Sequence, residues 1–234
     1  MSSLSQQVTH KINHASLNLT VATYLEQSLT KLKEFEGCVP WMYRDTVGKV
    51  TVGVGLMLPD TKAAESLPFL LGTRPATPQE IAAEYARVDS LPQGRASAFY
   101  KSATTHLELT QQTIDEKLTT VLQGFETELR THLPHYDTLP DGVKLALLDM
   151  TYNLGPEGLF KDFPHLITAV ESGSWAEAAA HCMRRGPSSA RNAWTREQFL
   201  SAVVTTIKAE TEGLLKRIWL AIRQTLNALF GPRQ

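Results

Sequence analysis

Hydrophobic residues recur at a helical period along most of the chain. Between residues 20 and 36 they return every three or four positions, which predicts an amphipathic helix. Gly37 follows and Pro40 lies three residues further on, so the helix is expected to stop at residue 36. The same period predicts four more helices and an amphipathic tail, over residues 110–131, 141–153, 163–172, 174–185 and 214–230.

The period changes to two after the first helix. Valine stands at residues 50, 52 and 54 with threonine or glycine between, which predicts a strand with one apolar face. Asp45 and Gly48 occupy the first and fourth positions of the preceding turn, as type I turns favour. Residues 41–56 are therefore expected to form a β-hairpin.

The segment 57–108 is the hardest to assign, because five prolines interrupt it. Thr77-Pro78-Gln79-Glu80 is a capping box with proline at the first helical position, so a helix is expected to begin there. Together the elements predict an α+β protein with a cleft between two lobes. In this division a polar tail precedes a small lobe with the hairpin and a larger helical lobe, over residues 1–18, 19–108 and 109–234.

The composition excludes several classes of protein. The 234 residues are 42% hydrophobic and 20% charged, which suits a folded core and not a disordered chain. Lys and Arg number 23 against 24 for Asp and Glu, so the basic excess that phosphate binding requires is missing and no nucleic-acid partner is expected. No apolar run approaches the roughly 18 residues of a membrane span, so stable membrane insertion is not expected.

Cysteine use and the amino-terminal residues suggest where the chain is made. Cys38 and Cys182 are too few for a disulfide framework, although a single bridge between them stays open. The first twenty residues carry no cationic start followed by an apolar block. We therefore expect synthesis in the cytoplasm without a signal peptide.

Glu36 is an anomalous residue in the first helix. At about 100° per residue it falls among the apolar side chains of Leu25 and Leu29, and it lies in the last helical turn. The apolar neighbours and the helix dipole both favour the neutral carboxyl group, which a general acid needs. The alternative is a surface glutamate whose carboxylate reaches past the helix end into water, and position alone favours this alternative.

Asp45 and Thr51 offer two further chemical groups. Asp45 is expected to be solvated and ionised, so that with Glu36 it matches the acid and base roles of glycoside hydrolysis. A plain turn-capping role explains Asp45 equally well. Thr51 shares a strand face with Gly53 and Gly55, which leaves room for a ligand to bind along the backbone. The alternative is that threonine simply favours strands and the glycines mark a bulge.

The same residues occur at a known spacing. Eight residues separate Glu36 from Asp45, and five separate Asp45 from Thr51. This spacing resembles the catalytic signature of the phage-type (T-even-like) lysozymes, glycoside hydrolase family 24. The flanking segments are similar too, namely Phe35-Glu36-Gly37, Tyr43-x-Asp45 and Gly48-Lys49-Val50-Thr51-Val52-Gly53-x-Gly55.

The resemblance covers roughly residues 20–205. The chain departs from the family pattern at Val54 and Leu56, and its segment 57–108 is longer than the phage pattern. Later segments resemble the central core helix and the C-terminal part of the family: Asp141-Gly142-Val143, Tyr152-Asn153-Leu154-Gly155, Ser174-Trp175 and Arg191-Asn192.

The resemblance implies a lysozyme-like fold and a muramidase, which hydrolyses the β-1,4 bond between N-acetylmuramic acid and N-acetylglucosamine in peptidoglycan. Glu36 would protonate the leaving oxygen, Asp45 would stabilise the developing positive charge and help to activate water, and Thr51 would hold that water. The family inverts the anomeric centre, which requires carboxyl groups about 6.5–9.5 Å apart. No metal ion or cofactor is implied.

Three more residues match positions of the family. Asn153 matches a substrate-binding amide on the core helix, and Tyr43 is a supporting aromatic residue of the motif. Arg191 matches an arginine that pairs with the catalytic glutamate. Such a pair would oppose the neutral form of the Glu36 carboxyl group. We therefore expect substrate binding to shift this group back toward its neutral form.

Part of the long segment resembles a bacterial group of these lysozymes. Leu67-Pro68-Phe69, Thr77-Pro78-x-Glu80-Ile81 and Glu84-Tyr85 are similar to lysozyme-like domains of cell-wall-degrading effectors, including those sent by type VI secretion. The resemblance implies peptidoglycan glycan strands as the substrate and an immunity protein or a secretion component as a further partner. An effector or an endolysin of this kind would act on the wall in the periplasm of a target cell or host, and we expect a monomer.

Other chemistry finds little support in the sequence. No HExxH, G-x-S-x-G or Walker motif is present, and the proline between His132 and His135 argues against a shared zinc site. Cys38 lacks a histidine signature that would activate it, so a structural thiol is expected. Two rival functions stay open: a lytic transglycosylase, which needs the acid but no positioned water, and a wall-binding domain without activity.

The carboxy-terminal tail carries its own pattern. Lys216, Arg217 and Arg223 lie on its polar side, so it could touch a membrane or a partner. Most often such a tail packs its apolar stripe on its own domain, and this is what we expect. The stripe consists of Leu214, Leu215, Ile218, Trp219, Ile222, Leu226, Leu229 and Phe230.

Overall fold

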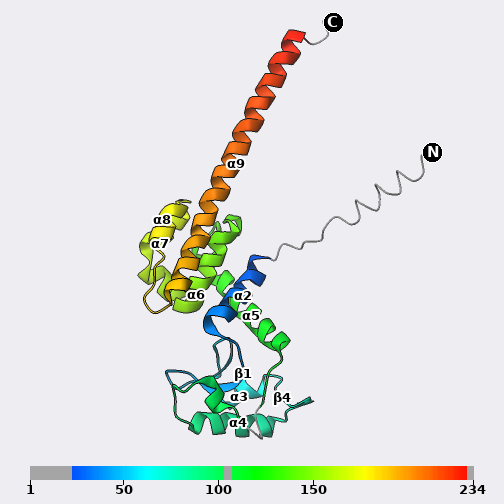
Figure 1. Cartoon of the computed structure of the whole chain (residues 1–234), viewed down its shortest axis with the longest axis vertical. Coiled ribbons are helices and arrows are strands. Elements are labelled where there is room, and N and C mark those ends of the chain that lie inside the picture. The colour runs from blue at the N-terminus through cyan, green and yellow to red at the C-terminus, as the bar shows by residue number, and fades with distance from the viewer. Residues whose placement is uncertain (1–22, 103–106, 231–234) are drawn as a thin grey trace, which may run out of the picture.

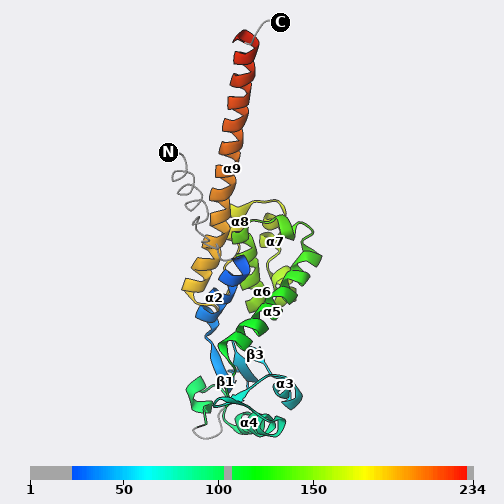
Figure 2. The same cartoon turned by 90° about the vertical axis from the view of Figure 1, so that its right-hand side faces the viewer.

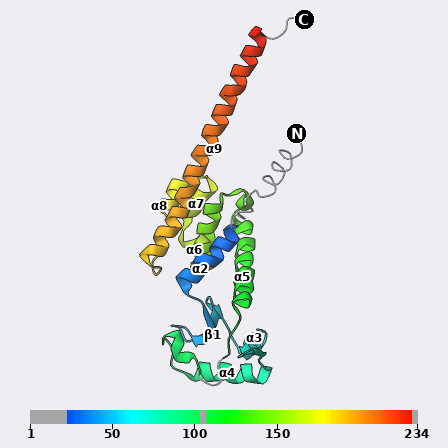
Figure 3. The same cartoon turned by 45° about the vertical axis from the view of Figure 1, so that its right-hand side comes forward.

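The computed structural model describes residues 23–102 and 107–230, and the predicted tail over 1–18 lies outside these residues. The strands and the helices of residues 61–100 gather at one end of the molecule and the remaining helices at the other (Figure 1). Helix α5 (Gln111–His132) runs from the first group to the second, as Figure 3 shows. The helices and the small antiparallel sheet confirm the predicted α+β class. The division into two lobes at residues 108 and 109 stays a prediction.

The helical part follows the predicted periodicity, except that the helix predicted over 174–185 ends at Ala180. Gly155 takes a φ of 72° and breaks helix α6 (Asp141–Asp162) at the predicted point. The first helical segment therefore ends where predicted, and a second segment begins at Pro156 and continues the same element after the kink. The helices of this part are α5, the 3₁₀ helix η2 (Tyr136–Thr138), α6 (Asp141–Asp162), α7 (Pro164–Glu171) and α8 (Trp175–Ala180).

Helix α2 (Tyr24–Glu36) starts later than the predicted residue 20, because a capping box sets its first turn. The Thr23 hydroxyl accepts from the Glu26 backbone N–H at 3.3 Å, and the Glu26 carboxylate accepts from the Thr23 N–H at 2.7 Å. The helix ends as predicted, and Gly37 takes a φ of 79°, a left-handed conformation that glycine adopts without strain.

Two polar contacts anchor α2 on α5. The Tyr24 hydroxyl donates to the Glu126 carboxylate near one end of α2. Near the other end Lys33 Nζ donates to Asp115 Oδ1 at 2.8 Å. The helical part of the molecule therefore fixes the position of Glu36, the last residue of α2.

The predicted hairpin is present. Strand β1 (Val39–Arg44) pairs antiparallel with β2 (Val50–Gly53), and β3 (Leu56–Met57) pairs with the other edge of β2. The register places Tyr43 opposite Thr51.

The two faces of strand β2 are both covered. The valines at 50, 52 and 54 are buried as predicted. On the other face Thr51 is only 3% exposed, and a Cβ added to Gly53 would lie 3.4 Å from Ile114. The strand face is therefore not bare, because Thr51 is buried and Ile114 of α5 lies beside Gly53, but a cavity remains next to Gly53 and Gly55.

Short elements fill the segment 57–108. Helix α4 (Pro78–Ser90) begins with the predicted capping box, since the Thr77 hydroxyl accepts from the Glu80 N–H at 3.3 Å and the Glu80 carboxylate accepts from the Thr77 N–H at 2.8 Å. Arg44 Nη1 of β1 donates to the Leu91 carbonyl at 2.6 Å and ties the hairpin to the end of this helix. The elements are α3 (Thr61–Glu65), β4 (Leu70–Leu71), β5 (Arg74–Pro75), α4 (Pro78–Ser90) and the 3₁₀ helix η1 (Ser97–Tyr100).

Helix α9 (Ser189–Phe230) has 42 residues and is the longest described element. Its amino-terminal part packs on α6 and α8, where Phe199 and Ala202 are buried. Beyond these residues the helix leaves the body of the molecule (Figures 1 and 2). The expectation that the apolar stripe packs on its own domain is therefore wrong for Leu214 to Ile222, which are exposed. Within the described ranges no helix has both the length and the hydropathy of a membrane span.

Candidate active site

The carboxylate of Glu36 meets a buried arginine. Glu36 is the last residue of α2, and its side chain is 31% exposed. Arg191, near the start of α9, is 5% exposed and donates from Nη1 to Glu36 Oε1 at 2.5 Å. The carboxylate thus has the charged partner that the family resemblance implies, while the rest of the side chain reaches solvent.

Arg191 is held from several sides. Its Nε donates to Asp149 Oδ1 at 2.7 Å, and its guanidinium lies 5.3 Å from the centre of the Phe35 ring. Phe35 in turn packs edge-on against Trp194 at 5.6 Å. Burial acts to lower the pKa of Arg191, but the carboxylates of Asp149 and Glu36 outweigh it and raise the pKa. The arginine therefore keeps its charge in the interior.

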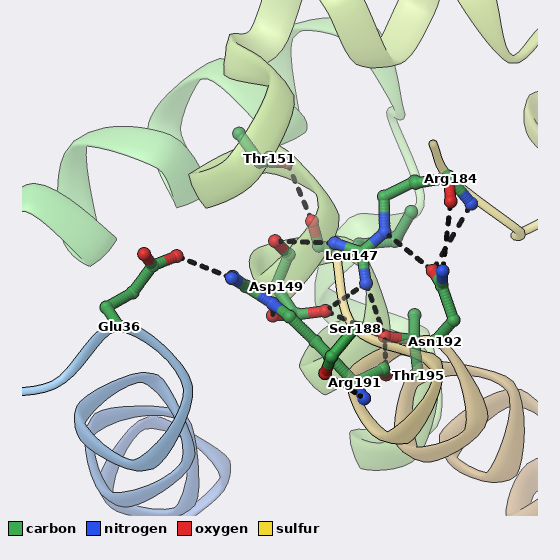
Figure 4. A network of polar contacts seen from close by, with 9 residues as sticks. All are labelled: Glu36, Leu147, Asp149, Thr151, Arg184, Ser188, Arg191, Asn192 and Thr195. Carbon is green, nitrogen blue, oxygen red and sulfur yellow. Dashed lines mark hydrogen bonds and ion pairs between the residues drawn. The ribbon is translucent and has the colours of Figure 1, made fainter. Parts of the chain in front are cut away.

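Asp149 of α6 is the centre of a buried network (Figure 4). Its Oδ2 accepts from Arg184 Nη2 at 2.6 Å and from Thr195 Oγ1 at 2.7 Å. Asn192 accepts from the Arg184 backbone N–H at 3.2 Å and donates to the Arg184 carbonyl at 2.9 Å. Two arginines therefore face two carboxylates, those of Asp149 and Glu36, and the formal charges cancel. Such pairing allows charged groups to stay buried.

The sequence-based site omits Asp149 and Arg184. Asp149 carries a visible signal, because it interrupts the apolar run 145–150, and a buried aspartate needs a partner. The partner itself has no local signal, since Arg184 lies 35 positions further along the chain and outside a helix.

Asp45 and Thr51 are held on the hairpin. Asp45 Oδ1 accepts from the backbone N–H groups of Val47 at 3.0 Å and of Lys49 at 2.7 Å. The turn-capping interpretation of Asp45 is therefore confirmed, and the cap fixes the carboxylate between β1 and β2. The Thr51 hydroxyl donates to the Lys49 carbonyl at 3.2 Å, so it is attached to the same turn.

Tyr43 links the two carboxylates. It is half-buried in β1, directly opposite Thr51. Burial raises the pKa of Tyr43, and the negative charges of Asp45 and Glu36 raise it further. Because the effect of a charge falls with distance, both carboxylates lie within electrostatic reach of one phenol. Both negative charges therefore act on the same phenol.

Tyr152 of α6 joins this site from the helical side. Its hydroxyl donates to the carbonyl of Val54, directly after β2. Burial raises the pKa of Tyr152, Glu36 and Tyr43 raise it further, and Arg191 acts in the opposite direction. On sequence alone, Tyr152 is only part of the segment that resembles the core helix. Its contact with Val54 becomes known from the fold.

A cavity of about 350 Å³ lies between the sheet and α5. Gly53 and Gly55 line it together with Tyr152 and apolar side chains of α5, so space exists beside the two glycines. None of the three predicted catalytic residues lines this cavity. Asn153 is exposed on α6, two residues before the break at Gly155.

A comparison with protein families decides what this chain is. The family model described as phage lysozyme matches residues 33–189, about two thirds of the sequence. The chain belongs to the phage lysozyme family. The match contains Glu36, Asp45 and Thr51, whereas Arg191 and most of α9 lie beyond it. A search of curated proteins finds no match to the chain.

Membership in the phage lysozyme family gives the fold and the activity. The protein is a lysozyme-type glycosidase that degrades peptidoglycan and acts on the cell wall, and its α+β arrangement is the lysozyme-like fold. In the described part of this lysozyme, no group of three or more His, Cys, Asp or Glu side chains is placed to hold a metal ion. Cys38 and Cys182 are both free, so the bridge that the sequence leaves open is not formed.

Proposed function

We propose that this lysozyme is an inverting muramidase that cleaves the β-1,4 bond between N-acetylmuramic acid and N-acetylglucosamine. The observation that carries the proposal is the phage lysozyme match, which spans Glu36 at the end of α2 and Asp45 in the hairpin turn. The charges of both carboxylates also raise the pKa of the Tyr43 phenol, which supports a shared site. Two carboxyl groups on either side of the scissile bond are the usual machinery of glycoside hydrolysis.

Glu36 is the proposed general acid. Arg191 binds Oε1, which leaves Oε2 to give a proton to the glycosidic oxygen as the bond from that oxygen to the anomeric carbon breaks. The Glu36 carboxyl group must carry that proton beforehand, so we propose that substrate binding loosens the contact with Arg191. Asp149 acts through Arg191 and is a positioning residue.

Asp45 and Thr51 are the proposed groups on the opposite face of the sugar. The Asp45 carboxylate stabilises the positive charge that develops on the ring and takes a proton from the attacking water. Thr51 holds that water, whose oxygen bonds to the anomeric carbon as the leaving group departs. Asn153 and the backbone at Gly53 and Gly55 are the proposed sugar-binding groups.

Product analysis tests this function against its closest rival. The protein is incubated with purified sacculi, and the released muropeptides are followed by mass spectrometry and by NMR of the new anomeric centre. We expect reducing N-acetylmuramic acid ends that appear first as the α-anomer. Anhydro-muramic acid ends would instead identify a lytic transglycosylase, and a first-formed β-anomer would identify a retaining enzyme.

We also propose that the enzyme lyses bacteria as an antibacterial effector or an endolysin. The support is the resemblance of segment 57–108 to effector lysozyme domains. The test produces the chain in a Gram-negative host in two forms. One form stays in the cytoplasm, and the other carries a signal peptide that directs it to the periplasm. Lysis from the periplasm alone is expected, and lysis that is suppressed by a neighbouring gene product would identify an immunity protein and favour the effector.

A further inference from the structure

The projecting part of α9 is an amphipathic helix without cover from the described residues. Trp175 Nε1 of α8 donates to Thr206 Oγ1 at 3.3 Å, and beyond that residue the helix extends away from the body (Figure 2). From residue 207 to residue 224 every position is exposed except Gly213, which is half-buried. The phage lysozyme match ends at residue 189, so this segment lies outside it.

One half of this helix is apolar. At about 100° per residue, five large side chains fall within roughly half of the circumference. Their exposed fractions are 56% for Leu214, 60% for Leu215, 47% for Ile218, 60% for Trp219 and 53% for Ile222. A contiguous exposed apolar face of this kind marks a surface that another apolar surface covers.

The other half of the helix is basic. Lys216 and Arg223 lie at the edge of the apolar face next to Trp219, and Arg217 lies at the opposite edge. The Arg223 guanidinium lies 5.3 Å from the Trp219 ring centre. No Asp or Glu occurs between residue 213 and residue 234. Cations at both edges of an apolar face that carries a tryptophan suit a surface of anionic headgroups above hydrocarbon.

We propose that α9 docks lengthwise on an anionic phospholipid surface. Trp219, Ile218 and Ile222 enter the boundary of the hydrocarbon, while Lys216 and Arg223 bind the lipid phosphates. A second copy of the chain is the competing occupant of the same face. The projecting part, residues 207–224, carries four cations and two acidic residues, Glu210 and Glu212, so two such helices would bring a net positive charge together. Charge complementarity therefore favours the lipid.

Vesicle flotation with the full chain tests the docking. Vesicles of phosphatidylglycerol and phosphatidylethanolamine are compared with vesicles of phosphatidylcholine, and we expect binding to the first and little to the second. Ile222→Glu should weaken binding about tenfold or more, because it places a charge on the apolar face. Leu220→Glu is the matched control, since Leu220 is 51% exposed but lies on the polar half, and it should bind far more strongly than Ile222→Glu.

The charge contribution is tested separately. Replacing Lys216, Arg217 and Arg223 together by glutamine should weaken binding to anionic vesicles about a hundredfold. Binding of the parent chain should fall as salt is added, because exposed charges are screened. All variants should digest lipid-free sacculi like the parent, which shows that they fold and separates this test from that of the muramidase.

Four results would overturn the proposal. Failure to bind anionic vesicles, or equal binding to phosphatidylcholine, would remove the anionic lipid as the partner. Equal effects of Ile222→Glu and Leu220→Glu would show that the apolar face is not the surface that binds lipid. A dimer in analytical ultracentrifugation without lipid, which Ile222→Glu converts to a monomer, would assign the face to a second copy instead.

Discussion

Glu36 and Arg191 form an ion pair of 2.5 Å across 155 positions of the chain. The contact joins the end of α2 to the start of α9, and Asp149 holds the arginine from α6. Three helices therefore fix the direction of one carboxylate. For a proposed general acid this matters, because the proton donor must lie within hydrogen-bond reach of the leaving oxygen.

Removal of Asp149 should unfold the protein more readily. Asp149→Ala leaves Arg184 without a carboxylate and Arg191 with Glu36 alone, so we expect a loss of about 3–5 kcal/mol in the free energy of unfolding. Urea denaturation measures this loss. Asp115→Ala is the matched control, because Asp115 pairs with Lys33 at the surface and should contribute at most about 1 kcal/mol. Similar losses in the two variants would contradict the buried network.

Two substitutions of Asp45 should separate its structural role from its chemical role. The amide oxygen of Asp45→Asn can still accept from Val47 and Lys49, so stability should change by less than about 0.5 kcal/mol. The lost charge should lower the rate of peptidoglycan hydrolysis about 100-fold or more. Asp45→Ala should lose the cap as well, at about 1 kcal/mol. A fully active Asp45→Asn variant would limit Asp45 to capping its turn.

Stability should fall at alkaline pH through the buried tyrosines. Burial raises the pKa of Tyr152 above its ordinary value of 10.0, so the folded protein binds the phenol proton more tightly than the unfolded chain does. This stabilisation is complete below pH 10.0 and is lost as the pH rises through the higher folded value.

Tyr152→Phe isolates this contribution. The variant loses the hydrogen bond to Val54, so it should be about 1 kcal/mol less stable at neutral pH. Its stability should then decline less steeply at alkaline pH than that of the parent. Urea denaturation across this range provides the measurement, and the same slope for both proteins would refute the assignment.

The two thiols should differ in reactivity. Burial raises the pKa of Cys182, which lowers its thiolate fraction, and the side chain is shielded from reagents. Cys38 is half-buried next to the end of α2. A thiol reagent should therefore modify one cysteine quickly in the native protein, and Cys38→Ser should abolish that phase. Rapid modification of both thiols would contradict the burial of Cys182.

The sequence predicts those parts of the fold whose signals are local. The end of α2 follows from Gly37, and the hairpin follows from the alternating valines and the turn at Asp45. The spacing of Glu36, Asp45 and Thr51 points to the chemistry before any contact is known. The signals of these features lie close together in the sequence, so one sequence without homologues is enough to predict them.

Other features depend on contacts that the sequence does not contain. Strand β4 has two residues and helix α3 has five, which is too short for a period to appear. The partners of Asp149 come from distant segments, so only the fold brings Arg184 and Arg191 to it. The pattern of α9 likewise predicts an apolar face and says nothing of what covers it.

The proposed general acid is tested most directly by the rate at which reducing ends appear in purified sacculi. Glu36→Gln keeps the size of the side chain and an oxygen for Arg191 but has no acidic proton to give, so the rate should fall about 100-fold or more with stability preserved. Glu34→Gln, at an exposed position of the same helix, should keep the parent rate. A Glu36→Gln variant as active as the parent would contradict the account.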